Sequence, residues 1–208
     1  GLMVLWRRGV GSFGHAFYFG LGAYAVAILD SELGVSDVFL RLLAGAVVAG
    51  FAGFLIGFIM RNYRDIFFAM LNTAISMVLF GIVVKTESLG STDGFAISAS
   101  TIFGLLPETK YPLFLIITIV GLSAALAVNF YLKTTFGKLT TAIRDNEIRV
   151  EYLGFSVAHA IHLKYTISAI LAGGAGALMA MSLGQVDPES MINWTVSGEL
   201  VFVTILSG

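Results

Sequence analysis

Apolar residues along this chain gather into five long blocks that are separated by shorter polar stretches. The blocks cover residues 10–29, 40–60, 66–84, 112–132 and 164–183. A helix needs about 20 mainly apolar residues to cross a bilayer, and each block is close to that length. A sixth apolar run starts near Val196. The pattern predicts an all-α protein, a polytopic transmembrane helical bundle.

The two ends of the sequence suggest that it is part of a longer protein. The sequence starts at Gly1 without a signal peptide and stops inside the sixth apolar run. We therefore expect one transmembrane domain, residues 1–208, that is truncated at both ends.

The composition agrees with a lipid environment. Hydrophobic residues make up 57% of the chain and charged residues 12%, against about 45–50% and about 25% in soluble domains. The chain has no cysteine, which excludes disulfides and thiolate ligands within it. A net charge of -1 gives no reason to expect nucleic acid as a partner.

The cations between the blocks predict the orientation. If the blocks alternate in direction, nine of the 12 Lys and Arg residues fall on one side, which the positive-inside rule places in the cytoplasm. The connections at residues 61–65 and 133–162 are then cytoplasmic, and the protein is a multi-pass protein of the cell membrane. The nine are Arg7, Arg8, Arg61, Arg64, Lys133, Lys138, Arg144, Arg149 and Lys164, and the other side has Arg41, Lys85 and Lys110.

Small residues recur at four-residue intervals in two of the blocks. Such ridges let helix backbones approach closely, which is how helices associate in lipid. Close packing is the interpretation we favour, and a flexible hinge is the alternative. One ladder is Gly45, Ala49, Gly53 and Gly57, and the second block has Ala169, Gly173 and Ala177 beside Ala172, Gly176 and Ala180.

The longest cytoplasmic connection, residues 133–162, contains an amphipathic pattern. Its apolar positions recur at helical spacing and predict one stripe: Leu139, Ala142, Ile143, Val150 and Leu153. Asn146 interrupts the stripe, and Ile148 lies apart from it among charges. One interpretation is a helix that rests on the membrane surface. The other is a helix that docks on a partner protein, and the mixture of acids and cations favours it slightly.

Several segments resemble one transporter family. Residues 137–154 read GKLTTAIRDNEIRVEYLG, and residues 12–24 read SFGHAFYFGLGAY. Both are similar to signatures of the permease subunits of branched-chain amino acid ABC importers, the LivM type. Weaker similarities follow in order at residues 67–71, 92–94 and 197–200, so that the resemblance covers nearly the whole chain.

The resemblance implies a membrane subunit of an ATP-driven importer. Its partners would be a second permease subunit, giving a heterodimer, two cytoplasmic ABC ATPase subunits and an external substrate-binding protein. The chain has no Walker motif, so ATP would bind to the partner subunits and this chain would bind no cofactor. The loop 133–162 would be the coupling segment, with the ATPase contact at Gly137, Arg144, Asp145, Asn146, Glu147, Ile148 and Gly154.

The sequence departs from the family pattern at a few positions. Phe13 stands where leucine is frequent, and Thr140 and Thr141 stand where Leu-Arg is common. Asn72 replaces the usual threonine within a predicted span. Urea-type and short-chain amide permeases share much of the pattern, so the substrate is either a branched-chain amino acid or such an amide.

Polar side chains inside predicted spans are candidates for a translocation pathway, because they are costly in lipid. The candidates are His15, Asn72, Thr73 and Ser76, with Asn129 as a further polar residue. For His15, a hydrogen bond between helices near the cytoplasmic end is favoured over proton transfer. For Asn72, Thr73 and Ser76, lining the pathway and bonding between helices are about equal alternatives.

Other classes of function find less support. An ion-coupled secondary transporter would need charges deep in the spans, and the five blocks have none near their centres. An intramembrane enzyme would need a convergent nucleophile and base, and only Ser12 and His15 lie together, so we predict no catalytic residues. His159 with His162, and Asp187 with Glu189, lack further ligands, so we predict no metal site. A structural scaffold fits the composition but leaves the coupling-type loop unexplained.

Overall fold

The computed structural model describes residues 14–63, 65–102, 104, 109 and 111–206. It is all-α apart from one short strand pair in the described part of the chain. The elements in order are α2 (His15–Leu33), α3 (Val38–Met60), α4 (Asp65–Lys85), the 3-10 turn η1 (Glu87–Leu89), β1 (Phe95–Ala96), α5 (Tyr111–Lys133), α6 (Thr135–Asp145), α7 (Glu147–Tyr152), α8 (Val157–Leu183), β2 (Gln185–Val186), α9 (Pro188–Met191) and α10 (Trp194–Leu206).

Five of these helices, α2, α3, α4, α5 and α8, are long and apolar enough to cross a membrane. They confirm the five predicted spans. The largest difference is that α8 begins at Val157 rather than at Lys164, so residues 157–162 belong to a helix and not to the predicted loop. Ser156 caps this helix by accepting a hydrogen bond from the His159 backbone N–H. The predicted cations at positions 7, 8, 64 and 110 lie outside the described residues.

Helices α2, α3 and α8 form a tightly packed core of three helices. The glycine and alanine ladders face one another in it, because a Cβ atom on Gly45 would lie only 2.7 Å from the Ala177 Cβ atom. Gly173 would likewise meet the side chain of Ala49, and Gly53 would meet that of Ala169. The predicted packing role of these ladders is confirmed.

The closest approach in the core is between the backbones of α2 and α8. A Cβ atom on Gly176 would overlap the carbonyl oxygen of Phe19, and one on Gly22 would overlap that of Gly173. Only glycine fits at such crossings, where the neighbouring atoms belong to backbone and cannot rotate away.

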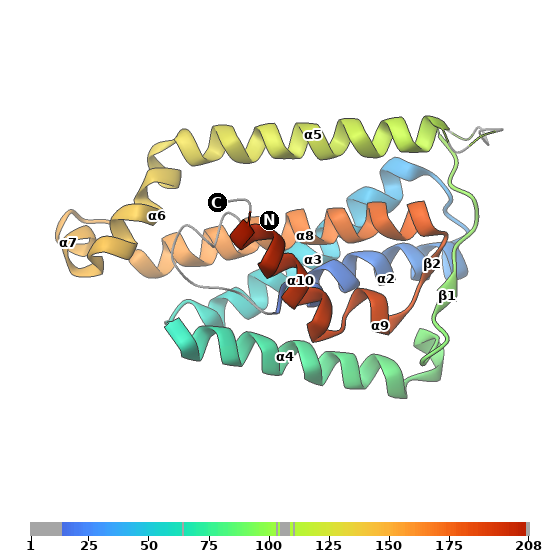
Figure 1. Cartoon of the computed structure of the whole chain (residues 1–208), viewed down its shortest axis with the longest axis horizontal. Coiled ribbons are helices and arrows are strands. Elements are labelled where there is room, and N and C mark those ends of the chain that lie inside the picture. The colour runs from blue at the N-terminus through green and yellow to red at the C-terminus, as the bar shows by residue number, and fades with distance from the viewer. Residues whose placement is uncertain (1–13, 64, 103, 105–108, 110, 207–208) are drawn as a thin grey trace.

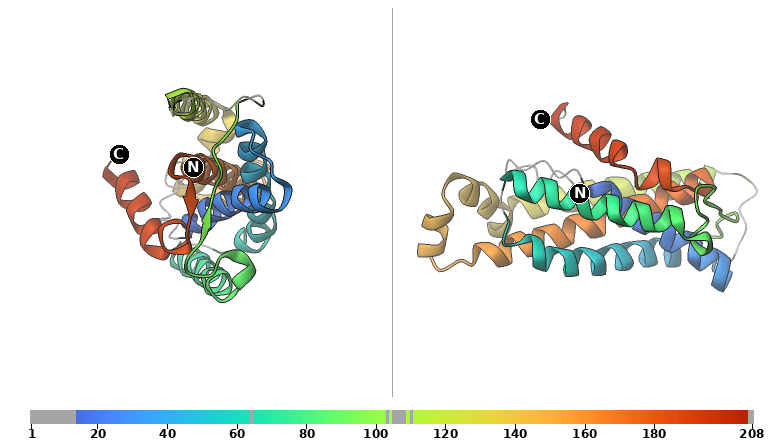
Figure 2. Two further views of the ribbon diagram at one scale, coloured as in Figure 1. Left: turned by 90° about the vertical axis from the view of Figure 1, so that its right-hand side faces the viewer. Right: turned by 90° about the horizontal axis from the view of Figure 1, so that it is seen from below.

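Helices α4 and α5 lie on opposite sides of the three-helix core (Figure 1), as the end-on view also shows (Figure 2). No described residue of α5 is buried. Helices α6 and α7 lie at one end of the bundle, which we call the loop end. Strands β1 and β2 lie at the opposite end, which we call the strap end (Figure 1).

The strap end is crossed by residues 86–102, which we call the strap. In its middle β1 pairs with β2 in antiparallel fashion, with Phe95 opposite Val186. Next to this pair the Ile97 N–H donates to the Gly184 carbonyl over 2.9 Å. Further along, the Val38 N–H donates to the Thr101 carbonyl over 3.0 Å. The strap is therefore attached to the ends of both α8 and α3.

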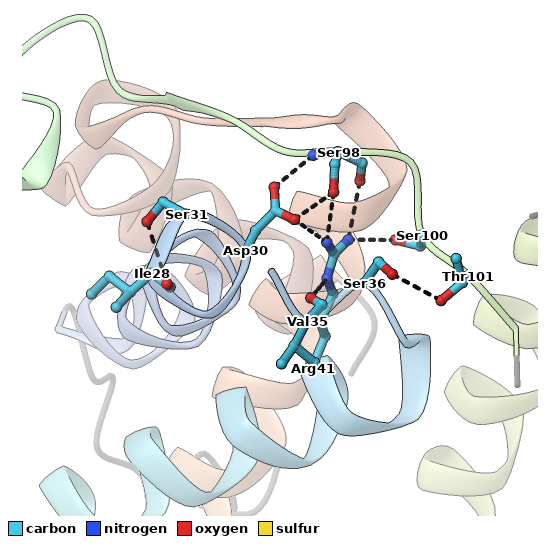
Figure 3. A network of polar contacts seen from close by, with 9 residues as sticks. All are labelled: Ile28, Asp30, Ser31, Val35, Ser36, Arg41, Ser98, Ser100 and Thr101. Carbon is cyan, nitrogen blue, oxygen red and sulfur yellow. Dashed lines mark hydrogen bonds and ion pairs between the residues drawn. The ribbon is translucent and has the colours of Figure 1, made fainter. Parts of the chain in front are cut away.

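A buried arginine holds the strap to α2 and α3 (Figure 3). The Arg41 side chain is fully buried and forms an ion pair with Asp30. Its other hydrogen bonds run from Nε to the Val35 carbonyl (2.8 Å), from Nη1 to the Ser98 carbonyl (3.1 Å) and to Ser100 Oγ (2.9 Å), and from Nη2 to Ser98 Oγ (3.0 Å). All five guanidinium N–H groups are thus used. Asp30 also accepts a bond of 2.7 Å from the Ser98 backbone N–H.

After α8 the chain turns back toward the bundle. The segment from β2 to α9 packs against α2, where Ile192 lies against Gly20. Helix α10 then begins at Trp194, and its Ser197 hydroxyl accepts a hydrogen bond of 2.9 Å from the Ala16 N–H. Helix α10 leaves the bundle at an angle (Figure 2). The first turn of α2 is therefore capped by a distant part of the chain.

Candidate functional site

Two regions contain the residues that the sequence marks for function. The first is the α6–α7 segment at the loop end (Figure 1). Its entry depends on Gly137, because a Cβ atom there would lie within 2.7 Å of the Leu132 carbonyl carbon. Thr134 caps α6 by accepting a hydrogen bond from the Gly137 N–H (3.3 Å). Glycine at this position thus lets α6 fold back closely on the end of α5.

Asn146 divides the segment into two helices. Its backbone is extended (φ −164°, ψ 101°), and its N–H donates to the Ala142 carbonyl at the end of α6 over 3.0 Å. Its side-chain oxygen accepts a bond of 2.9 Å from the Arg149 N–H and so starts α7. The interruption that the sequence predicts at Asn146 is therefore a change of direction between two helices.

The predicted single stripe is only partly present because of this change of direction. Ile143 and Val150 are buried against the beginning of α8, and Leu139 packs on them. Ala142 and Leu153 are exposed, so the prediction was wrong for these two. A second apolar group, which we call the apolar tip, points outward and consists of Ile148, Tyr152 and Leu153, with exposed fractions of 65%, 87% and 72%.

Most of the other predicted contact residues lie close to the apolar tip in the sequence. Asp145 is exposed and Glu147 is half-buried at the start of α7. Gly154 has φ +84°, a left-handed conformation that favours glycine, and it ends the turn after α7. Arg144 belongs to the last turn of α6, and its side chain lies outside the described part of the structure.

Replacing Asn146 with alanine is expected to weaken α7 by about 1 kcal/mol, the usual value of an N-cap. The amides of residues 147–152 should then exchange with deuterium roughly fivefold faster, measured by mass spectrometry on the full-length protein. Asn146→Asp keeps a capping oxygen and should leave the exchange nearly unchanged. Equal exchange in the alanine variant would mean that other contacts hold α7.

The second region is a buried group of polar side chains between α2, α4 and α8, which we call the polar cluster: His15, Tyr18, Asn72, Tyr165 and Ser168. All five are at most 2% exposed. By helix geometry, Tyr165 lies about 12 Å along α8 from Val157, and Asn72 about 10 Å along α4 from Asp65. The cluster therefore lies inside the membrane-length part of the bundle.

Hydrogen bonds connect the polar cluster across the helices. The Tyr18 hydroxyl donates to the Tyr165 hydroxyl (2.7 Å), and the Tyr165 hydroxyl donates to the side-chain oxygen of Asn72 (2.6 Å). His15 Nε2 and Ser168 Oγ are hydrogen-bonded at 2.6 Å. The rings of His15, Tyr18 and Tyr165 pack edge to face, with centroids 5.6 to 6.5 Å apart. Buried polar groups in a bundle need such partners.

The structure brings together some of the predicted pathway residues and separates others. His15 and Asn72 lie in the polar cluster. Ser76 lies one turn further along the same buried face of α4, and its hydroxyl has no hydrogen-bond partner among the described residues. Thr73 is half-buried and donates to the Ala69 carbonyl of its own helix (2.9 Å). Asn129 is exposed on α5.

Sequence reasoning missed Tyr18, Tyr165 and Ser168. Tyrosine and serine are common in membrane helices, so neither stands out alone. One signal was available: Tyr165 precedes Ala169 by one turn and therefore extends the ridge of small residues along α8. A polar residue that continues a packing ridge must face the core.

Most of the side chains weighed above for proton transfer, catalysis or metal binding form hydrogen bonds within the described structure. His15 and Ser168 are both buried against the core, so their hydrogen bond joins α2 to α8 and is closed to solvent in this conformation. His159 Nδ1 bonds Ser156 Oγ (2.9 Å), and His162 Nε2 bonds the Phe54 carbonyl (2.9 Å). Asp187 caps α9. Within the described ranges, no group of three or more His, Cys, Asp or Glu side chains is arranged to hold a metal ion.

Comparison with known proteins identifies the family. All of residues 1–208 match the family described as branched-chain amino acid transport system / permease component. Two relatives are the high-affinity branched-chain amino acid transport system permease proteins LivM of Salmonella typhimurium and Escherichia coli, each 28% identical over 233 residues. The match covers 100% of this chain and 52% of each relative, so the chain spans about half the length of these relatives. No solved structure matches the chain. The chain belongs to the family of branched-chain amino acid transport permeases.

Proposed function

We propose that this chain is part of the membrane subunit of an ATP-driven importer of branched-chain amino acids. The observation that carries the proposal is the α6–α7 segment with its apolar tip. Two short, capped helices extend beyond the membrane-length helices (Figure 1). Ile148, Tyr152 and Leu153 in this segment are exposed. Membership of the permease family supports the same function.

The apolar tip fits a protein partner. Three large apolar side chains are exposed together on a segment that also carries Asp145, Glu147 and Arg149. An apolar centre with a rim of both charges is the usual composition of a protein interface. We propose that the partner is an ABC ATPase subunit, that residues 133–156 form the coupling loop, and that Gly137, Asn146 and Gly154 shape it. ATP then binds to the partner.

The proposed orientation places the loop end in the cytoplasm and the protein in the inner membrane. Arg61, Lys133, Lys138 and Arg149 gather at the loop end, as the positive-inside rule requires. At the strap end Arg41 is paired with Asp30, so its charge is balanced there. The strap end would face a substrate-binding protein, and a second permease subunit would complete the membrane pathway.

Replacing Ile148 with asparagine is expected to reduce co-purification of the ATPase subunits with the full-length permease by about tenfold. A few residues near the centre of an interface contribute most of its binding energy, about 2 kcal/mol or more each, and about 1.4 kcal/mol is a factor of ten. The measurement is the ratio of ATPase to permease after affinity purification, with the size-exclusion profile as a check of folding.

The matched control is Ala142→Asn, which adds the same amide to an exposed position of α6. It should leave the ratio unchanged. If Ile148→Asn also leaves the ratio unchanged, the apolar tip is not the docking contact. If the wild type binds no ATPase at all, an ion-coupled transporter becomes the leading alternative. A separate assay distinguishes a branched-chain amino acid from an amide as the substrate. It measures uptake of labelled leucine into vesicles in competition with unlabelled urea.

A further inference from the structure

Helix α4 buries one line of residues against the rest of the bundle, and partly buried apolar residues such as Leu71 and Leu79 flank this line. Its buried residues are Phe68, Asn72 and Ser76, which recur every four residues and therefore lie above one another. Met70 and Val78 on its other faces are 63% exposed. Figure 1 shows α4 at the edge of the bundle, apart from the three-helix core. We call the contact between this face of α4 and helices α2 and α8 the α4 seam.

The α4 seam differs in chemistry from the seams inside the core. Between α3 and α8, small apolar residues interlock, as at Gly45 with Ala177 and at Gly53 with Ala169. The α4 seam instead contains the Asn72 amide, the Tyr165 hydroxyl and the Ser76 hydroxyl. Gly14 approaches Asn72 so closely that a Cβ atom would lie 2.6 Å from its backbone oxygen. Polar bonds also join α2 to α8 within the core, but there the backbones cross at Gly22 and Gly176 with no room for a Cβ atom, whereas the described glycine of α4 meets no such close neighbour.

The polar groups of the α4 seam determine whether lipid or water could fill it if it opened. If α4 moved away in lipid, Asn72 and Tyr165 would lose their bond with no replacement, which is strongly unfavourable. If water entered instead, both groups would be hydrated. Water would also satisfy the Ser76 hydroxyl, which has no partner among the described residues in the closed arrangement. An opened α4 seam is therefore stable only as an aqueous route.

We propose that the α4 seam opens to water during transport and that Tyr165 is the positioning residue that holds it closed. This proposal rests on the proposed transport function. Tyr165 is suited to the role because its hydroxyl joins both sides: it accepts from Tyr18 on α2 and donates to Asn72 on α4. The opened route is lined by Asn72 and Ser76 on one side and by Tyr165 on the other.

Cysteine labelling tests the proposal, since these 208 residues contain no cysteine. Ser76→Cys is introduced into the full-length protein in membrane vesicles, with any cysteine elsewhere replaced by serine. The label is a charged, water-soluble methanethiosulfonate. Adding Tyr165→Phe, which removes only the hydroxyl, is expected to raise the labelling rate at position 76 about five- to tenfold. Asn72→Ala breaks the same bond from α4 and should also raise it.

Two matched controls separate opening from general loosening. Tyr24→Phe also removes a buried hydroxyl, but one with no hydrogen-bond partner among the described residues, so labelling at position 76 should not change. Val78→Cys lies on the exposed face of α4 and should stay unlabelled in lipid in every background. An unchanged rate at position 76 with Tyr165→Phe, or an equal rise at position 78, overturns the proposal.

Labelling is measured without substrate or ATP, so its result does not depend on whether the proposed transport function is correct. If leucine uptake is absent but labelling responds as expected, the transport assignment fails and the seam still opens. If uptake is normal and labelling does not respond, the seam proposal alone fails.

Discussion

Replacing Arg41 with methionine is expected to lower the free energy of unfolding by about 3 kcal/mol, the lower end of the range for breaking a buried ion pair. Arg41 is fully buried, and the Asp30 side chain keeps an exposed fraction of 12%, which reduces the cost of leaving its charge unpaired. The strap would also lose its bonds from the guanidinium to Ser98 and Ser100. The measurement is unfolding of the full-length protein by SDS in mixed micelles.

Further variants identify the cause of the loss. Arg41→Lys keeps the charge but not the planar fork, so we expect an intermediate loss. Asp30→Asn together with Arg41→Met leaves no charge unpaired and should cost less than Arg41→Met alone. Glu32→Gln changes an exposed acid nearby and should stay within about 0.5 kcal/mol of the wild type. A loss for Arg41→Met as small as that of Glu32→Gln would contradict the role given to Arg41.

Replacing Gly176 with alanine is expected to cost about 1–3 kcal/mol, or more, because the added methyl group overlaps the Phe19 carbonyl oxygen. The overlapping atom belongs to backbone, so α2 and α8 must move apart. We expect a lower midpoint in the same SDS titration and a smaller yield of monodisperse protein.

Gly174→Ala is the matched control on the same helix. A Cβ atom there would have only the Leu42 Cδ1 atom nearby, at 3.7 Å, which is an ordinary contact. Alanine is also the better helix former by about 1 kcal/mol. The control should therefore be neutral or stabilising, whereas Gly176→Ala should be destabilising. Equal effects at both positions would mean that the crossing of α2 and α8 has room to spare.

The membrane-length helices could be predicted because lipid imposes one requirement on every span, a long apolar run. The start of α8 could not, since His159 and His162 give its first turns the composition of a loop. The His159 side chain bonds to the neighbouring Ser156, and the His162 side chain bonds to the Phe54 carbonyl on α3. Both rings therefore have partners, which lets a helix continue through them.

The polar contacts between distant segments could not be predicted from local sequence patterns. Arg41 could be assigned to one side of the membrane, but nothing near it in sequence indicates Ser98 as its partner. The same holds for Asn72, which was marked as unusual, and Tyr165, which was not. Position in a pattern identifies a polar residue that needs a partner, and only the packing of helices determines which partner it finds.

The bond between Ala16 and Ser197 has a consequence for how the protein is made, since it joins residues 181 positions apart. At translation rates of about 5–20 residues per second, roughly ten to forty seconds pass between the synthesis of the two. During that interval the Ala16 N–H group in the first turn of α2 lacks its later acceptor. The beginning of α2 is therefore synthesised early but capped late. A ribosome that stalls before α10 leaves the Ala16 N–H without the Ser197 hydroxyl.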